Sequence, residues 1–181
     1  GEWWRLIAAG FLHADLLHIA FNMYALYNLG RLLERFYGSI RVSVLYALSL
    51  IGSSTLVLLL SSPDVPTVGA SGAIMGMLGG LLAYYWRYRD SLAGGRNYLN
   101  QLIRLALINI GIGLLPGISM WGHAGGFLAG LGVGWALHPR YRFEHSLTLR
   151  QRPLSWTSKL EVLGILLLEL AMIALALGWR F

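Results

Sequence analysis

The chain has 181 residues, of which 56% are hydrophobic and 12% are charged, and its formal net charge is +6. This composition is too apolar for a soluble domain of this size, so it predicts a polytopic membrane protein. The sequence contains no cysteine, which excludes disulfides, thiol catalysis and cysteine-based metal sites. The basic residues stand between apolar segments and not on one soluble face, which argues against nucleic acid as a partner.

Residues 1–17 mix tryptophan and phenylalanine with charged and polar residues, which is typical of a loop or re-entrant segment at the membrane interface. Six apolar segments follow, each near the roughly 17 to 25 residues that cross a bilayer as a helix. We therefore expect an all-α bundle of about six transmembrane spans, at residues 16–33, 42–60, 68–86, 99–115, 121–137 and 160–178.

The basic residues predict the orientation of these spans. Nearly all of the 14 Lys and Arg residues lie in or beside the connections that follow the first, third and fifth spans. By the positive-inside rule these connections are cytoplasmic, so the other connections face outward. We expect an integral protein of a bacterial inner membrane, with its active site facing the exterior or periplasm.

Ser71 begins the third span, and small residues then recur along that span every three or four positions. This spacing produces a helix face with almost no side chains, which lets a neighbouring helix approach closely. A second such face follows His123, at Gly126 and Gly130. If the two faces pack together, Ser71 and His123 begin adjacent helices. A serine beside a histidine in a partly dry site is a candidate nucleophile and base.

His18 and Asn22 share one helix face at the outward end of the first span, because they are four residues apart. With the backbone N–H of Ser71, they could stabilise the oxyanion of an acyl-transfer reaction, at about 3 kcal/mol for each donor. The alternative is a pair of interhelical hydrogen bonds worth about 1 kcal/mol each. The spacing alone does not decide between these two interpretations.

Other catalytic arrangements find less support. The outward ends of the third and fifth spans carry no Asp or Glu, so a dyad of Ser71 and His123 is favoured over a charge-assisted triad. A zinc site would need His13, His18 and His123 together, but position 22 is Asn, which is a poor zinc ligand. We expect no metal and no cofactor.

A family resemblance is carried by motifs in both halves of the chain. They are Gly69-Ala70-Ser71-Gly72, His123 followed by Gly126 and Gly130, His18-x-x-x-Asn22, Glu2-x-Trp4-Arg5 in the first loop, and Glu34 with Gly38 at the cytoplasmic end of the first span. Together they resemble the rhomboid family of intramembrane serine proteases.

The resemblance implies that Ser71 is the nucleophile and His123 the general base, with His18 and Asn22 as oxyanion donors. It also implies that the substrate is a transmembrane segment of another protein, which enters from the lipid bilayer between the first and fourth spans. The alternative is a proteolytically inactive relative that binds membrane helices. The sequence does not indicate an oligomeric state.

The resemblance further implies three regions: a catalytic core at residues 1–138, a basic cytoplasmic linker at 139–159 and an additional transmembrane helix at 160–181. The first span of the family core precedes its tryptophan-arginine loop, so we expect a further span upstream of Gly1. We expect His138 and His145 to be solvated on the cytoplasmic side. Glu169 lies in the last span, and the sequence assigns it no role.

Overall fold

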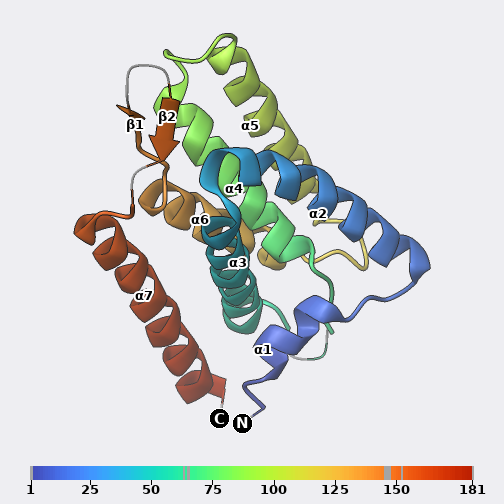
Figure 1. Cartoon of the computed structure of the whole chain (residues 1–181). Coiled ribbons are helices and arrows are strands. Elements are labelled where there is room, and N and C mark those ends of the chain that lie inside the picture. The colour runs from blue at the N-terminus through green and yellow to red at the C-terminus, as the bar shows by residue number, and fades with distance from the viewer. Residues whose placement is uncertain (1, 63, 65, 145–147, 152, 181) are drawn as a thin grey trace.

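The computed structural model describes residues 2–62, 64, 66–144, 148–151 and 153–180. The described chain is helical except for one short antiparallel hairpin of two strands (Figure 1). The elements in order are α1 Arg5–Ala8, the 3-10 turn η1 Ala9–Phe11, α2 Leu16–Tyr37, α3 Ser39–Leu60, α4 Ser71–Tyr88, α5 Gly95–Ile112, α6 Met120–Ala136, β1 Tyr141–Glu144, β2 Thr148–Gln151 and α7 Trp156–Arg180. The expected helical bundle is confirmed, whereas the sequence did not predict the hairpin.

Each of the six long helices matches one predicted span, with shifted ends. Among the described residues, two helices are long and apolar enough to cross a membrane alone, Ser39–Leu60 and Trp156–Gly178. The pair Arg5–Phe11 and Leu16–Tyr37 passes the same test together, with a bend of 94° between its halves. The remaining helices are shorter, and α6 has only 17 residues. Among them, α4 is enclosed by other helices, so it needs less apolar surface than a helix that faces lipid.

Helix α4 is the centre of the bundle. Its residues from Gly72 to Tyr85 are all buried, and α2, α3, α5 and α6 pack around it. Figure 1 shows α4 in the middle of the bundle and α7 along one edge. The substantial contacts that the described part of α7 makes with other long helices are with α3 and α6. The helix that begins at Ser71 is therefore enclosed by four other long helices.

Helices α4 and α6 pack backbone against backbone. A Cβ atom added at Gly126 would overlap the carbonyl oxygen of Gly72, and one added at Gly130 would overlap that of Gly76. A step of four residues along α4 is thus matched by a step of four along α6. The two helices run parallel and in register, so their first turns lie at the same level.

Tyr37 joins α4 and α6 farther along, at Gly80 and Gly134. Its hydroxyl, at the end of α2, lies 2.9 Å from the carbonyl oxygen of Gly80 and 3.0 Å from that of Gly134. The side chain is 1% exposed, so this polar group is satisfied entirely within the protein. Tyr37 therefore stabilises the glycine contact at the end opposite to Ser71.

The glycine contact predicts that alanine substitutions at two nearby glycines of α6 have different effects on the stability of the fold. Gly130→Ala should lower the stability of the fold by about 1–3 kcal/mol, because the new methyl group must push the α4 backbone away. Gly132→Ala should be neutral or stabilising by up to roughly 1 kcal/mol, because a Cβ there meets only Ile165 Cδ1, at 3.6 Å. Thermal unfolding of both variants in the same detergent measures this difference. Equal stability of the two variants would contradict the proposed role of the contact.

The expectation that His138 is solvated is wrong. This residue follows α6, and only 7% of it is exposed. Its Nδ1 lies 2.7 Å from the carbonyl oxygen of Trp135, and its Nε2 accepts a hydrogen bond of 3.2 Å from Arg140 Nε. Burial lowers the pKa of His138 below its usual value, although the hydrogen bond to Trp135 opposes this shift. His145 lies outside the described residues.

The lowered pKa of His138 predicts that acid destabilises the fold. As pH falls through about 6.5, the unfolded chain takes up a proton that the folded chain resists, so stability present above that pH is lost. Thermal unfolding between pH 8 and pH 5 should show this loss, and His138→Gln should make the dependence less steep. An unchanged pH dependence in the variant would assign the loss to other groups.

Candidate active site

The first turns of α4 and α6 lie side by side at one end of the bundle. Ser71 is the first residue of α4, and the side chain of Ser119 caps α6 by accepting a hydrogen bond of 3.0 Å from the N–H of Gly122. A Cβ atom added at Gly72 would lie 3.2 Å from the carbonyl oxygen of Gly122. Because Ser71 and His123 are the chain neighbours of these two glycines, the structure brings them to adjacent positions.

The two side chains differ in exposure and are not hydrogen-bonded to each other. Ser71 is half-buried, and His123 is 7% exposed. In the described part of the chain no hydrogen bond joins the Ser71 hydroxyl to the imidazole ring. In many hydrolases this bond becomes short only when substrate is bound. Ser71 and His123 therefore remain a predicted dyad.

A backbone carbonyl fixes the tautomer of His123. The Nδ1 atom lies 3.0 Å from the carbonyl oxygen of Asn109 in α5. A carbonyl oxygen can only accept a hydrogen bond, so Nδ1 carries the proton of the neutral ring and Nε2 is left as a proton acceptor. This is the state that a general base for a serine hydroxyl requires.

The carbonyl of Asn109 is available to His123 because it lies in the last turn of α5. The N–H of Gly113 bonds to Ile110 at 3.0 Å instead of continuing the helical pattern to Asn109. The last carbonyls of a helix lack helical partners and form the negative end of its dipole, which favours a positively charged imidazole beside them. The sequence analysis did not identify Asn109, because every residue has a backbone carbonyl.

His18 is held in the opposite tautomer at the start of α2. Its Nδ1 accepts a hydrogen bond of 3.3 Å from the N–H of Ala14, so the proton of the neutral ring lies on Nε2. The side chain of Asp15 caps this helix by accepting a hydrogen bond of 2.8 Å from the N–H of His18. The neutral His18 ring is thus a hydrogen-bond donor through Nε2.

The Nε2 atom of His18 faces the loop that leads to Ser71. A Cβ added at Gly69 would lie 2.7 Å from His18 Nε2 and 3.7 Å from Asn22 Nδ2. Gly69 has a φ of +119°, which L side chains rarely adopt. Asn22 is 5% exposed and donates one hydrogen bond of 3.0 Å to the carbonyl of His18, which leaves its second N–H available. The structure brings His18 and Asn22 together at this loop.

His13 packs beside His18 at the start of α2. The two ring centroids are 5.0 Å apart at an angle of 72°. Both ring nitrogens of His13 are shielded from solvent and make no hydrogen bond within the described residues. Across those residues, no three His, Asp or Glu side chains converge as a metal site.

The first segment fastens the serine loop to α3. The N–H of Gly69 donates a hydrogen bond of 2.9 Å to the carbonyl of Ala9, and Ser54 Oγ of α3 donates one of 2.6 Å to the carbonyl of Leu6. In the predicted Glu2-x-Trp4-Arg5 motif, Arg5 forms an exposed ion pair of 2.6 Å with Glu2. These contacts hold the loop and do not reach the Ser71 hydroxyl.

Glu34 and Gly38 lie at the opposite end of α2 from His18. Gly38 has a φ of +79° and makes the turn into α3. The hydroxyl of Ser39, the first residue of α3, donates a hydrogen bond to the Glu34 carboxylate. Both residues therefore shape a turn that is far from the candidate site.

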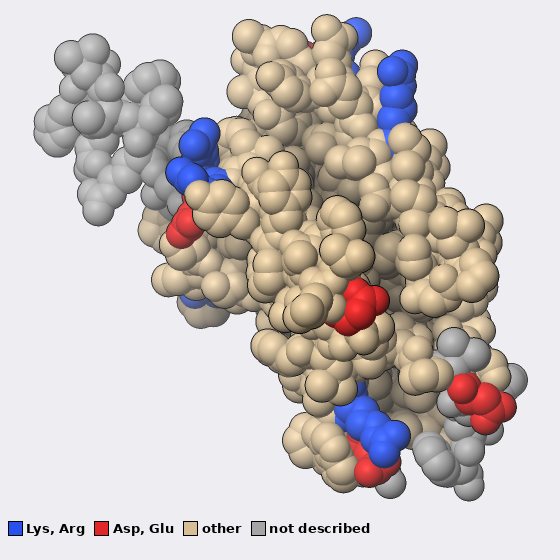
Figure 2. All heavy atoms as spheres, turned by 90° about the vertical axis from the view of Figure 1, so that its right-hand side faces the viewer, with Lys and Arg blue, Asp and Glu red and all other residues tan. Residues whose placement is uncertain are grey.

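Helices α2 and α5 each pack against α4. Within the described residues they share no substantial interface with each other. Figure 2 shows this side of the molecule, whose surface is largely uncharged. Large apolar side chains are exposed on both helices, among them Phe21 on α2 and Leu107 on α5. Such exposed apolar side chains are expected where a helix faces lipid.

The fold and the site define a helical membrane protein with a candidate serine hydrolase site at one end of its bundle. Residues 1–140 match the Rhomboid domain family, and the chain belongs to this family.

The chain is similar to named rhomboid proteins from bacteria, fungi and plants. It is 38% identical to Rhomboid protease GluP of Bacillus subtilis over 138 residues, which cover 76% of this chain and 26% of that protein. It is 32% identical to Rhomboid-type serine protease 2 of Emericella nidulans, over 74% of this chain and 26% of the relative. It is 35% identical to RHOMBOID-like protein 4 of Arabidopsis thaliana, over 77% of this chain and 36% of the relative. The chain thus spans less than half the length of these relatives.

The two tautomers give a direct spectroscopic prediction. In protein labelled with 15N-histidine and held near pH 8, His18 should show a protonated Nε2 and His123 a protonated Nδ1, because their backbone partners differ. Nitrogen chemical shifts distinguish the tautomers, and the variants His18→Gln and His123→Gln assign the signals. The same tautomer at both positions would contradict the assigned hydrogen bonds.

Proposed function

We propose that this chain is an intramembrane serine protease that cleaves transmembrane segments of other membrane proteins. The observation that carries the proposal is the pair of opposite tautomers: His123 presents a proton acceptor through Nε2, and His18 presents a donor beside the loop before Ser71. Membership of the rhomboid family supports it further, since relatives in bacteria and fungi are named serine proteases.

In the proposed mechanism, the Ser71 hydroxyl gives its proton to His123 Nε2 while its oxygen attacks the substrate carbonyl. The negative oxygen then accepts hydrogen bonds from His18, Asn22 and the N–H of Ser71. That N–H belongs to the first turn of α4, where backbone donors have no helical partner. His123 next passes its proton to the leaving amine, and a water molecule releases the acyl group from Ser71.

The substrate helix is proposed to enter between α2 and α5, where the exposed surface is apolar. A peptide bond within a regular helix is shielded by its own hydrogen bonds, so the substrate needs helix-weakening residues near the cut. We place the active site at the non-cytoplasmic face by the positive-inside rule. The same proposal divides the chain into a core at residues 1–138, a cytoplasmic linker at 139–159 and an added helix at 160–181.

The alternative is a rhomboid protein that binds membrane helices without cleaving them. The lack of a hydrogen bond between Ser71 and His123 favours it in one respect, because an active dyad must form that bond during the reaction. Covalent labelling with a fluorophosphonate separates the two functions, because the probe reacts only with an activated serine.

Substitutions at the site should reduce activity only where a side chain, and not the backbone, takes part in the proposed reaction. Ser71→Ala and His123→Ala should reduce labelling and the cleavage of a test transmembrane substrate below about one thousandth. Asn109→Ala should retain most of both activities, because the backbone carbonyl that contacts His123 is unchanged.

Ser43→Ala is the matched control, since Ser43 is exposed near the other end of the bundle. Strong labelling of Ser71→Ala would refute the nucleophile assignment. Stable protein without any labelling of the wild type would favour the non-cleaving alternative.

A further inference from the structure

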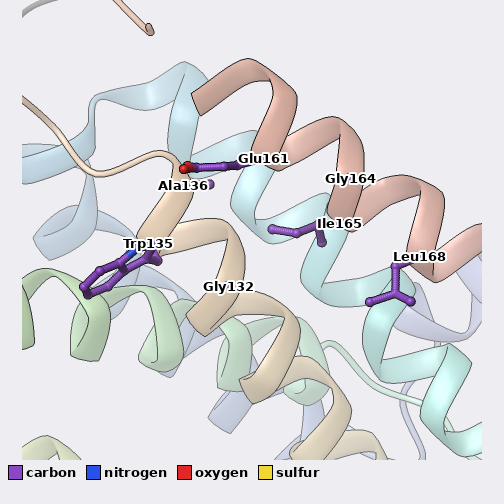
Figure 3. A pocket seen from close by; sticks show the side chains of 7 residues that line it. All are labelled: Gly132, Trp135, Ala136, Glu161, Gly164, Ile165 and Leu168. Atoms are coloured by element: carbon purple, nitrogen blue, oxygen red, sulfur yellow. The ribbon is translucent and has the colours of Figure 1, made fainter. Parts of the chain in front are cut away.

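A groove of about 390 Å³ runs between α6 and α7, toward the end of α6 that is farther from His123. Its walls are apolar except at one point, and the lining includes Gly132, Trp135 and Ala136 of α6 with Glu161, Gly164 and Leu168 of α7. Figure 3 shows Trp135 and Glu161 toward one end of the groove and Leu168 toward the other. The groove is therefore apolar along most of its length and carries polar groups at one end.

Charges of both signs surround the end that holds Trp135. The guanidinium of Arg87 lies over the Trp135 ring, 5.2 Å from its centroid. Arg140 donates a hydrogen bond to His138, and both arginines and Glu161 interact electrostatically with that histidine. The three charged side chains are exposed, and none forms an ion pair within the described part of the chain. Two cations and one anion thus lie around His138, and within the described residues none of the three is paired with an opposite charge.

We propose that this groove binds one phospholipid whose headgroup carries both a phosphate and a primary ammonium group, as in phosphatidylethanolamine. One acyl chain lies along the apolar wall, the phosphate pairs with Arg87 and Arg140, and the ammonium pairs with Glu161. The wall belongs to lipid-facing helices in a membrane protein, so hydrocarbon is its natural cover. A tryptophan beside an arginine is typical of the depth at which headgroups begin.

The charge pattern selects this headgroup over two others. A phosphatidylglycerol headgroup has a phosphate but no cation, so it leaves the Glu161 carboxylate beside a negative group. A phosphatidylcholine headgroup has a cation with no N–H, so it cannot donate a hydrogen bond to that carboxylate. The site lies away from Ser71, and the proposal does not depend on proteolysis.

The acyl-chain position is tested by filling the groove. A Cβ at Gly164 meets nothing within 4 Å, so Gly164→Leu places its side chain in open space without a clash. Gly178→Leu is the matched control, because Gly178 is on the same helix, is equally unobstructed and does not line the groove.

Proteins are released from bilayers with equal amounts of phosphatidylethanolamine and phosphatidylglycerol of the same chain length, and retained lipid is counted by native mass spectrometry. Wild type and Gly178→Leu should each retain one phosphatidylethanolamine, and Gly164→Leu should retain at least fivefold less. Equal retention by the two leucine variants would overturn the proposed site.

The headgroup assignment is tested in the same bilayers. Wild type should retain phosphatidylethanolamine over phosphatidylglycerol by at least threefold. Glu161→Gln should abolish this preference, and the double change Arg87→Gln with Arg140→Gln should lower retention of both lipids.

Lys159→Gln is the charge control, because Lys159 lies over the Trp156 ring and does not line the groove, so the preference should persist. Two results would overturn the headgroup assignment. One is that the wild type retains the two lipids in the ratio in which the bilayer contains them, and the other is that Glu161→Gln keeps the preference for phosphatidylethanolamine.

Discussion

The structure depends on the direct contact between the backbones of α4 and α6. Glycines on both helices remove the side chains that would separate them, so a methyl group at Gly126 or Gly130 has no room. Association of helices in a membrane relies on such packing, because lipid chains are as apolar as the side chains they replace. The contact also fixes the register of two parallel helices. For that reason Ser71 and His123 begin their helices at one level.

Two histidines of the candidate site are held in different tautomers because each has a different backbone partner. His123 faces a carbonyl at the end of α5 and becomes an acceptor at Nε2, whereas His18 faces the N–H of Ala14 and becomes a donor at Nε2. Neither arrangement needs a carboxylate, which explains how a site without Asp or Glu at the ends of α4 and α6 can hold both rings in defined states. Carbonyl groups at helix ends also cost less to bury than an ionised acid.

The sequence was sufficient for features that depend on side-chain pattern. Apolar length predicted the long helices, and glycine spacing predicted the two faces that meet. Backbone features were not predictable in this way: the carbonyl of Asn109 and the hydrogen bond from Gly69 to Ala9 leave no residue-type signal. The hairpin and the burial of His138 were not predicted, because the basic composition of residues 139–159 indicates only that the segment is exposed to solvent. It does not indicate how the chain packs where this segment leaves α6. The catalytic roles of Ser71, His123, His18 and Asn22 remain predictions. The geometry adds to them which ring nitrogen of each histidine would accept or donate a proton.

The same close packing gives Glu169 a place inside the bundle. This acid lies in the apolar helix α7, yet it is 3% exposed and faces α3 and α6 instead of lipid. A Cβ at Gly52 would lie 2.9 Å from Glu169 Oε1, so the glycine at this position of α3 leaves space for the carboxyl group. An acid exposed to hydrocarbon costs several kcal/mol, which favours the orientation that turns α7 toward the core. Glu169 and the glycine opposite it on α3 thus favour one rotation of α7 about its axis.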